Sequence, residues 1–272
     1  MIVLGLFRVI FVIWCALSTV SNAWNLDKEQ PPPKNSLGVR LDFYLANAWP
    51  IPLLKKGKQI SRTFLWSSHL KFDSEVSKLT DAQLWQMAHD GYWEMFENMK
   101  LYDITNKRDS PRAFTVLAVG NEIFLSSSMK GGGNFASAYP RTRVSKSLDL
   151  CQITFNTRGG EGTNGHKNSG NCGEVMSAQM YYTTDDNENT PLKTKDARVC
   201  TVVLNHADIP QNTDPCSDKR TWGCNLFVDE EGMQKLDVKI TPESYDLNKI
   251  MGKPVISQIP LCASANTGLV SE

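Results

Sequence analysis

Residues 113–126 have the sequence AFTVLAVGNEIFLS, which predicts two adjacent strands. The first part, 113–119, is almost entirely apolar, as is typical of a strand that is buried on both faces of a sheet. Gly120-Asn121 predicts a tight turn, and 122–126 then returns as the partner strand of a hairpin. Because a strand buried on both faces needs other elements above and below it, we expect a layered α/β domain.

Helical patterns precede and follow this hairpin. Thr80-Asp81-Ala82-Gln83 has the form of a capping box, and apolar residues then recur at helical spacing. A second helix is expected from about 170 to 182, a buried strand at 197–204 and a last strand at 236–240. This order of elements predicts an α/β fold, a three-layer arrangement in which helices cover both faces of the sheet.

The rest of the chain is divided by its composition. Residues 24–79 begin with a proline-rich stretch and lack a clear periodicity, so we interpret them as a leader and a peripheral segment. The catalytic domain is expected over 80–240, and 241–272 is expected to be a C-terminal extension that wraps it. Within the domain, 129–170 contains two glycine-rich clusters, which we interpret as mobile loops.

The first 23 residues have the features of a secretory signal peptide. Met1 to Arg8 is short and positively charged, Val9 to Val20 is almost uninterruptedly apolar, and Ser21-Asn22-Ala23 offers small residues for cleavage. The apolar run is short for a membrane span. We therefore expect residues 1–23 to be removed and the protein to be secreted, with no membrane segment left; an uncleaved signal anchor is the alternative.

The charge balance limits the partners that we expect. The chain has 29 basic and 29 acidic residues, and loss of the signal peptide removes only Arg8, which leaves 28 against 29 and a net charge of −1. Electrostatic binding along a nucleic-acid duplex needs a basic protein face, so we do not expect this protein to bind duplexes in that way. A nucleoside or a short single strand that binds in a pocket remains compatible with this balance.

The cysteines have two possible uses. Of seven in the chain, Cys15 lies in the signal peptide, and an even number remains that could form up to three disulfides in a secreted protein. Cys172-Gly173-Glu174 stands at the expected start of a helix, however, and Pro215-Cys216 and then Cys224 follow. Three thiolates could hold a zinc ion and leave its fourth position open. We interpret the remaining cysteines as core or disulfide residues: Cys151, which precedes an expected extended stretch, Cys200 in a buried strand, and Cys262.

The order of these motifs resembles that of the cytidine-deaminase-like superfamily of zinc hydrolases. In that family a capped helix precedes a hairpin, and a second helix begins with His or Cys, any residue, and Glu. A third strand then leads to Pro-Cys and a second Cys. The resemblance covers roughly residues 80–240. The family usually places two residues between the downstream cysteines, whereas seven residues, 217–223, intervene here.

The resemblance implies a zinc-dependent deaminase. Cys172, Cys216 and Cys224 would hold Zn²⁺, and Glu174 would act as the general acid and base. A zinc-activated water would attack the ring carbon that bears an exocyclic amine, in a free nucleoside or in a nucleic acid. Combined with secretion, this activity implies a toxin or effector that acts on another cell.

Two other functions fit the same residues. Cys172 and His206 could be the nucleophile and base of a papain- or transglutaminase-like enzyme, with Asp229 orienting the histidine. Alternatively, the cysteines could be disulfide staples in a secreted binding protein without catalytic activity. The remaining histidines have no partners at metal-ligand spacing and are expected to face solvent: His69, His89 and His166.

Overall fold

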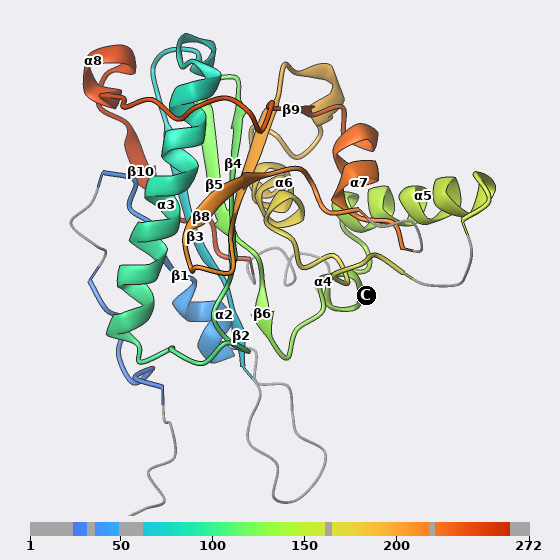
Figure 1. Ribbon diagram of the computed structural model, residues 1–272, viewed down its shortest axis with the longest axis horizontal. Helices are drawn as coiled ribbons and strands as arrows, with labels where there is room; N and C mark the ends of the chain where they lie inside the picture. Colours follow the sequence, from blue (N-terminus) through green and yellow to red (C-terminus); the bar gives the residue numbers. More distant parts are fainter. Residues whose placement is uncertain (1–23, 32–35, 49–61, 161–164, 218–220, 262–272) are drawn as a thin grey trace, which may run out of the picture.

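The protein has a central sheet with helices on both faces (Figure 1). This is a computed structural model, which describes residues 24–31, 36–48, 62–160, 165–217 and 221–261. The main path through the sheet has the strand order β1-β3-β5-β4-β7-β8. The strands on this path are β1 (Arg40–Leu41), β3 (Trp66–Lys71), β5 (Glu122–Ser127), β4 (Ala113–Val119), β7 (Arg198–Leu204) and β8 (Pro210–Thr213).

Two further strands extend this sheet. β10 (Val255–Ser257) pairs with β3, and β9 (Gln234–Lys235) pairs with β7. The pairing of β9 with β7 is parallel, whereas the other pairings are antiparallel. β8 pairs with 201–204 and β9 with 198–199, so the two occupy different halves of the same β7 edge.

The hairpin expected at 113–126 is confirmed and lies in the middle of the sheet. β4 pairs with β5 on one side and with β7 on the other, so Val116 faces Leu125 and Cys200 across the two ladders. The side chains of β4 point alternately to the two faces, and both faces are apolar because each is covered by a helix.

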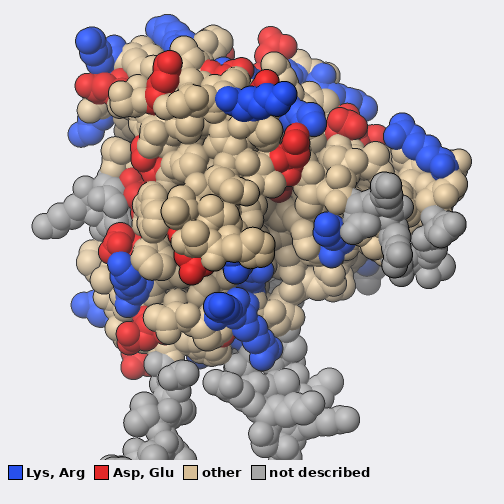
Figure 2. All heavy atoms as spheres, viewed as in Figure 1, with Lys and Arg blue, Asp and Glu red and all other residues tan. Residues whose placement is uncertain are grey.

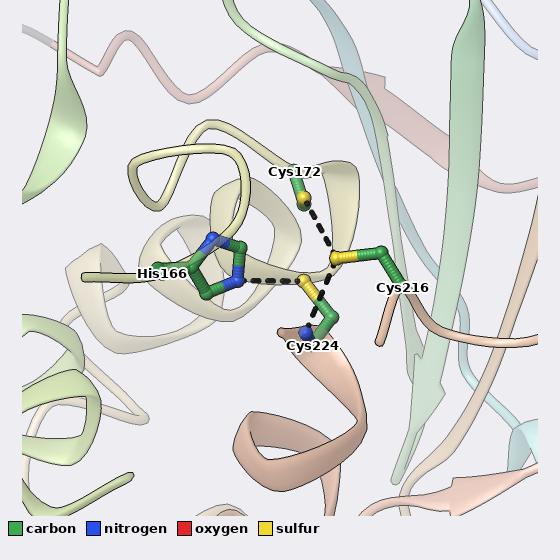
Figure 3. Close-up of side chains that lie close together, drawn as sticks. All are labelled: His166, Cys172, Cys216 and Cys224. Atoms are coloured by element: carbon green, nitrogen blue, oxygen red, sulfur yellow. Dashed lines mark hydrogen bonds between the residues drawn. The ribbon is translucent and has the colours of Figure 1, made fainter. Parts of the chain in front are cut away.

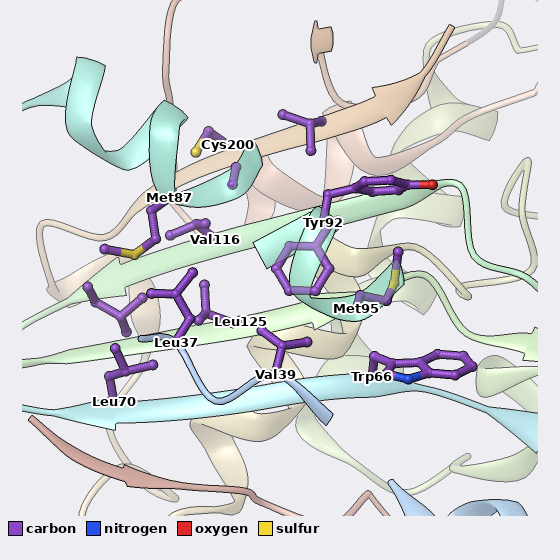
Figure 4. Packing of buried hydrophobic residues seen from close by; sticks show 14 of the residues in the cluster. Leu37, Val39, Trp66, Leu70, Met87, Tyr92, Met95, Val116, Leu125 and Cys200 are labelled. Carbon is purple, nitrogen blue, oxygen red and sulfur yellow. The ribbon is translucent and has the colours of Figure 1, made fainter. Parts of the chain in front are cut away.

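The two expected helices cover opposite faces of the sheet. α3 (Asp81–Leu101) packs on one face, where Figure 4 shows Met87 and Tyr92 against Val116 and Leu125. α6 (Gly173–Thr183) packs on the other face, together with the apolar side chains that alternate with these along β4 and β5. The predicted α/β fold is therefore confirmed.

The start of α3 follows the capping pattern of the sequence. The Thr80 hydroxyl accepts a hydrogen bond from the Gln83 backbone N–H at 3.2 Å, and the Gln83 side-chain oxygen accepts one from the Thr80 N–H at 3.0 Å. These two bonds satisfy backbone donors that a helix start otherwise leaves without a partner. The capping box predicted from the sequence is therefore present.

Residues 24–79 are not a peripheral segment, contrary to the expectation. β3 is an inner strand that pairs with β5 over five residues, and Trp66 and Leu70 are fully buried. The sequence of β3 hides this position because it contains Ser67, Ser68 and His69. Polar side chains can be buried where they find hydrogen-bond partners, and the Ser68 hydroxyl donates to the Leu37 carbonyl at 2.5 Å. The sheet thus begins well before residue 80.

Two expectations for the region after the hairpin are also wrong. A helix, α5 (Arg143–Thr157), occupies much of the stretch 129–170, and Cys151 lies in this helix rather than before an extended stretch. The expected strand at 236–240 is a turn in which the Ile240 N–H donates to the Asp237 carbonyl at 3.1 Å; the parallel pairing occurs just before it, in β9. α7 (Cys224–Glu230) precedes this turn.

The C-terminal part of the described chain returns to the sheet. After α8 (Leu247–Met251), β10 pairs with β3, and the Leu261 N–H donates to the Asp42 carboxylate at 2.8 Å. The remaining elements are β2 (Thr63–Phe64), β6 (Lys130–Gly131), α2 (Phe43–Ala48), α4 (Phe135–Ala138), and the short 3₁₀ turns Val76–Lys78 and Leu192–Thr194.

The expected signal peptide, 1–23, lies outside the described residues. Within the described ranges, none of the helices combines the length and the apolar character needed to cross a bilayer. On the face shown in Figure 2, basic and acidic side chains of the described residues are mixed.

Candidate metal centre

Four side chains converge beside the N-terminus of α6: His166, Cys172, Cys216 and Cys224 (Figure 3). One ligand atom from each lies within 4.8 Å of the others. The sulfurs of Cys172 and Cys216 are 3.6 Å apart, and Cys224 Sγ is 3.3 Å from His166 Nε2. Sulfurs bound tetrahedrally to one zinc at ~2.3 Å lie about 3.8 Å from each other. The cluster therefore has the dimensions and the donor chemistry of a site that could hold a metal ion.

Cys172 is placed by the way in which α6 meets the sheet. It is the N-cap residue of the helix, and the next residue, Gly173, lies against β4 and β5. A Cβ at this position would lie 2.3 Å from Thr115 Oγ1 and 3.1 Å from the Ser126 carbonyl oxygen. The Ser126 hydroxyl also donates to the Gly173 carbonyl at 2.9 Å. The glycine between Cys172 and Glu174 therefore lets the helix start close to the sheet.

Replacement of Gly173 by alanine is expected to destabilise the protein by about 1–3 kcal/mol, the usual cost of overpacking a core. The reason is that the added methyl group overlaps Thr115 and pushes α6 away from the hairpin. Chemical denaturation of the variant measures the effect. Gly165→Ala is the matched control, because a Cβ there has open space within 4 Å. Equal stability of the two variants would contradict this account of the motif.

The long spacing between Cys216 and Cys224 does not keep their side chains apart. The Cys224 backbone N–H donates to Cys216 Sγ at 3.3 Å, and the Asn225 N–H donates to the Cys216 carbonyl at 3.2 Å. A Cβ on Gly223 would lie 2.1 Å from the Cys216 carbonyl oxygen. Gly223 therefore permits the close approach of the two ends of this loop, and it is the signal in the sequence that our reasoning missed.

His166 is the fourth member of the cluster, and the expectation that it faces solvent is wrong. Its side chain is buried at 8% exposure and lies edge-on to the Trp222 ring, with the centroids 4.9 Å apart. The sequence did not reveal this contact because His166 and Cys224 are far apart along the chain and belong to no shared motif. Only the Gly/Asn-rich loop just before Cys172 indicated a chain segment that could fold back on the cysteine.

The two other histidines that were expected to face solvent, His69 and His89, also have partners. His69 is buried between Glu122, with Nε2 and Oε1 3.2 Å apart, and Ser257, with Nδ1 and Oγ 3.0 Å apart. His89 Nε2 lies 2.9 Å from the side-chain oxygen of Asn212. His69 thus links three neighbouring strands, which also contradicts the expectation of a solvent-facing ring.

Glu174 lies one residue into α6 and is buried at 3% exposure. The Thr201 hydroxyl donates to Glu174 Oε1 at 3.0 Å and is itself 2.8 Å from the Thr115 hydroxyl. Burial raises the pKa of the Glu174 carboxyl, and the negative charge of Cys216 raises this pKa further, whereas hydrogen bonds from Thr201 and Cys224 lower it. The carboxyl thus interacts electrostatically with Cys216 and Cys224 of the cluster.

A small cavity reaches Glu174 from the edge of the sheet. It has a volume of about 10 Å³, and its lining includes Thr201 in β7, Thr213 at the end of β8 and Lys235 in β9. The cavity therefore lies at the edge of β7, between the part of that strand that pairs with β8 and the part that pairs with β9. Lys235, which lines the cavity, forms an ion pair with Asp214, with Nζ and Oδ1 2.9 Å apart.

The three thiols have different tendencies to ionise. The pKa of Cys216 is held well below its usual range because the Cys172 and Cys224 thiols donate hydrogen bonds to it. The hydrogen bond between Cys172 and Cys216 raises the pKa of Cys172, and burial raises the pKa of Cys224. Ionisation of the cluster is therefore favoured at Cys216 over Cys172 and Cys224, and thiolate is the form that ligates metals.

The described cysteines form no disulfides among themselves. All five are free thiols: Cys151, Cys172, Cys200, Cys216 and Cys224. The 3.6 Å between the sulfurs of Cys172 and Cys216 also exceeds the ~2.05 Å of a disulfide bond. The sixth cysteine of the expected secreted chain, Cys262, lies outside the described residues.

The residues of the alternative cysteine-enzyme mechanism are not brought together by any contact. His206 lies exposed in the turn after β7, and Asp229 is exposed on α7. Among the residues that the structure describes, no hydrogen bond or ion pair joins the side chain of either one to Cys172. The histidine that does reach the cysteine cluster is His166.

No protein family, curated protein or solved structure matches this chain. The chemistry of the cluster and its surroundings is therefore the basis for the function proposed below.

Proposed function

We propose that this protein is a zinc-dependent hydrolase that deaminates a nucleobase, with Cys172, Cys216 and Cys224 as zinc ligands. The observation that carries this proposal is the convergence of the three thiols beside the buried carboxyl of Glu174. Thiolates are soft ligands that favour zinc in a tetrahedral site. A carboxyl that is not itself a ligand, but lies beside the ligands, is the group that such chemistry needs to move protons.

When bound, zinc supplies a Lewis acid that makes water acidic enough to act as a nucleophile near neutral pH. Glu174 takes the proton from the attacking water and delivers it to the ring nitrogen of the substrate. It then takes the proton of the newly added hydroxyl group and gives it to the amine, so that the C–N bond breaks, a C=O bond forms on the ring carbon and ammonia leaves. The hydrogen bond from Thr201 orients the carboxyl, and the raised pKa of Glu174 helps it to hold the proton between these steps.

The surroundings of Glu174 leave little free space. The cavity beside Glu174 has a volume of about 10 Å³, about the space of one water molecule, so it can hold the attacking water, and the substrate base has to widen it to enter. The base can belong to a nucleoside or to a single strand, because a base in a duplex must first leave the stack. The secretion signal in the sequence supports a role as a toxin or effector.

An assay of ammonia release tests this function. Zinc-loaded protein is incubated with cytidine, adenosine, and short single-stranded DNA and RNA oligonucleotides, and mass spectrometry identifies the base that has exchanged an amino group for oxygen. We expect one of these substrates to be converted. Cys151→Ala is the control, because Cys151 lies in α5 and outside the cluster. A zinc-loaded protein that releases no ammonia from any of them would contradict the proposal.

A second function is favoured by one observation, the presence of His166 as a fourth donor within 4.8 Å of the sulfurs. Zinc sites with four protein ligands are typically structural, whereas catalytic sites keep one position open. If His166 is a ligand, the cluster stabilises a secreted binding protein that has no catalytic activity. The role of His166 therefore decides between the two functions.

A further inference from the structure

The hydrogen bonds of His166 show which of its ring nitrogens carries the proton. We infer that His166 donates a hydrogen bond from Nε2 to the Cys224 sulfur and is not a metal ligand, so that the fourth position of the site stays open. This inference rests on the proposed function, because an open metal position matters only if the site catalyses hydrolysis. The hydrogen bonds that lead to it are independent of that function.

Two backbone amides converge on the other ring nitrogen. The Asn168 N–H donates to His166 Nδ1 at 3.0 Å, and the Gly170 N–H donates to the same atom at 3.2 Å. A neutral imidazole has one nitrogen that accepts and one that donates. Because Nδ1 accepts both bonds, the ring hydrogen belongs on Nε2, which faces Cys224 Sγ at 3.3 Å. Nε2 then has no free lone pair for a metal ion.

A metal-ligating histidine usually makes the opposite set of hydrogen bonds from those of His166. A histidine that binds a metal through one nitrogen usually donates the N–H of its other nitrogen to a carboxylate or a carbonyl. Binding through Nε2 would move the hydrogen of His166 to Nδ1, where it would point at the N–H groups of Asn168 and Gly170. Both amides would lose their acceptor, and an unsatisfied N–H close to the protein interior is unfavourable.

The loop around the ring holds this arrangement in place. The Ser169 N–H donates to the His166 carbonyl at 2.8 Å, and the Asn171 N–H donates to the Asn168 carbonyl at 2.9 Å. On its other side the ring contacts Trp222, whose indole N–H donates to the Gln152 side chain at 2.7 Å. The direction of the ring is therefore fixed by the backbone and by packing, without help from an ion.

Hydrogen-bond donors surround the sulfurs as well. The Asn168 side-chain amide donates to Cys172 Sγ at 3.2 Å and to Cys216 Sγ at 3.5 Å, and the Cys224 N–H also donates to Cys216 Sγ. Three thiolates place an excess of negative charge on a divalent ion, and such donors offset part of it. His166 completes this set at Cys224. It is therefore a positioning residue, which orients and partly neutralises a ligand.

Nitrogen NMR of ¹⁵N-histidine-labelled protein tests the inference directly. The two neutral tautomers have distinct ¹⁵N and ¹H correlation patterns, and the His166→Gln variant identifies the signal of His166. We expect the tautomer with hydrogen on Nε2 in the metal-free protein and also after loading with ¹¹³Cd²⁺, with no coupling between the ring nitrogen and cadmium. Hydrogen on Nδ1 in the metal-free protein, or cadmium coupling to Nε2, would overturn the inference.

The metal-free spectrum also separates this inference from the proposed function. If the chain binds no metal but has the expected tautomer, the proposed function fails and the role of His166 as a donor to Cys224 stands. If metal binds and couples to the ring, His166 is a ligand, and the inference fails even if the ammonia assay is positive.

Variants of His166 give a second readout, the affinity for zinc. His166→Ala is expected to lower it by about 10–100-fold, as is typical when an outer-shell partner is lost. His166→Gln should recover part of this loss, because its amide can still donate to the thiolate. His89→Ala is the control, since His89 contacts Asn212 and not the cluster. A loss in both His166 variants as large as that in Cys224→Ala would overturn the inference.

Discussion

Replacement of Glu174 by glutamine is expected to lower the rate of deamination by about 10²–10⁴-fold, the usual contribution of a general acid–base group. Glutamine has nearly the same size as glutamate and can still accept the hydrogen bond that Thr201 donates. It cannot take a proton from water or deliver one to the substrate. Steady-state kinetics measures the rate, and metal analysis of the same sample measures zinc, which we expect to remain equimolar.

The zinc content separates the proposed role of Glu174 from a structural one. Glu97→Gln is a matched control, because Glu97 is an exposed carboxylate on α3 that pairs with Lys100 at 2.7 Å. This control should keep both zinc and turnover. Two results would contradict the role given to Glu174: turnover close to that of the wild type, or a loss of zinc as large as that caused by removal of a cysteine.

Replacement of Cys216 by alanine is expected to lower the zinc affinity by more than about 100-fold, the upper end of the effect of losing an outer-shell partner. Cys216 is the member of the cluster whose sulfur contacts the most other members: it lies 3.6 Å from Cys172 Sγ and accepts the N–H of Cys224. Hydrogen bonds from the Cys172 and Cys224 thiols also lower the pKa of Cys216, which favours the thiolate form that ligates metals. Equilibrium dialysis followed by metal analysis measures the change.

Thermal unfolding shows the same loss as a change in stability. An ion that binds only the folded chain stabilises it by about 4 kcal/mol at a free concentration 1,000 times its Kd. The wild type should therefore unfold at a lower temperature after chelation, and Cys216→Ala should not respond to the chelator. Cys151→Ala is the control, since it loses packing in α5 but no ligand. A chelator response of Cys216→Ala equal to that of the wild type would show that Cys216 is not a ligand.

The parts of the fold that the sequence predicted are those with a local signal. The hairpin at β4 and β5 has an apolar run and a turn pair, and α3 has a capping box at Thr80. β3 could not be predicted in this way, because its burial depends on partners elsewhere in the chain. Ser68, for example, donates to the carbonyl of Leu37, which lies 31 residues earlier.

The residues of the candidate site also divide into those with a local sequence signal and those without one. Cys172, Glu174, Cys216 and Cys224 were selected from the order of motifs, and the structure brings the three cysteines together. His166 was missed because its contact with Cys224 spans 58 residues and depends on the fold of two loops. The long loop between the downstream cysteines was an apparent obstacle. It closes because its last residue has no side chain, a condition that becomes visible only in three dimensions.

The central claim is that the three cysteines hold zinc, and thiol alkylation of the native protein combined with metal analysis tests it most directly. We predict equimolar zinc, with Cys172, Cys216 and Cys224 resistant to alkylation until a chelator removes the ion, after which mass spectrometry finds the label on all three. A protein that contains no zinc when it is purified with the metal present, or one whose three thiols react at the same rate before and after chelation, would contradict the claim.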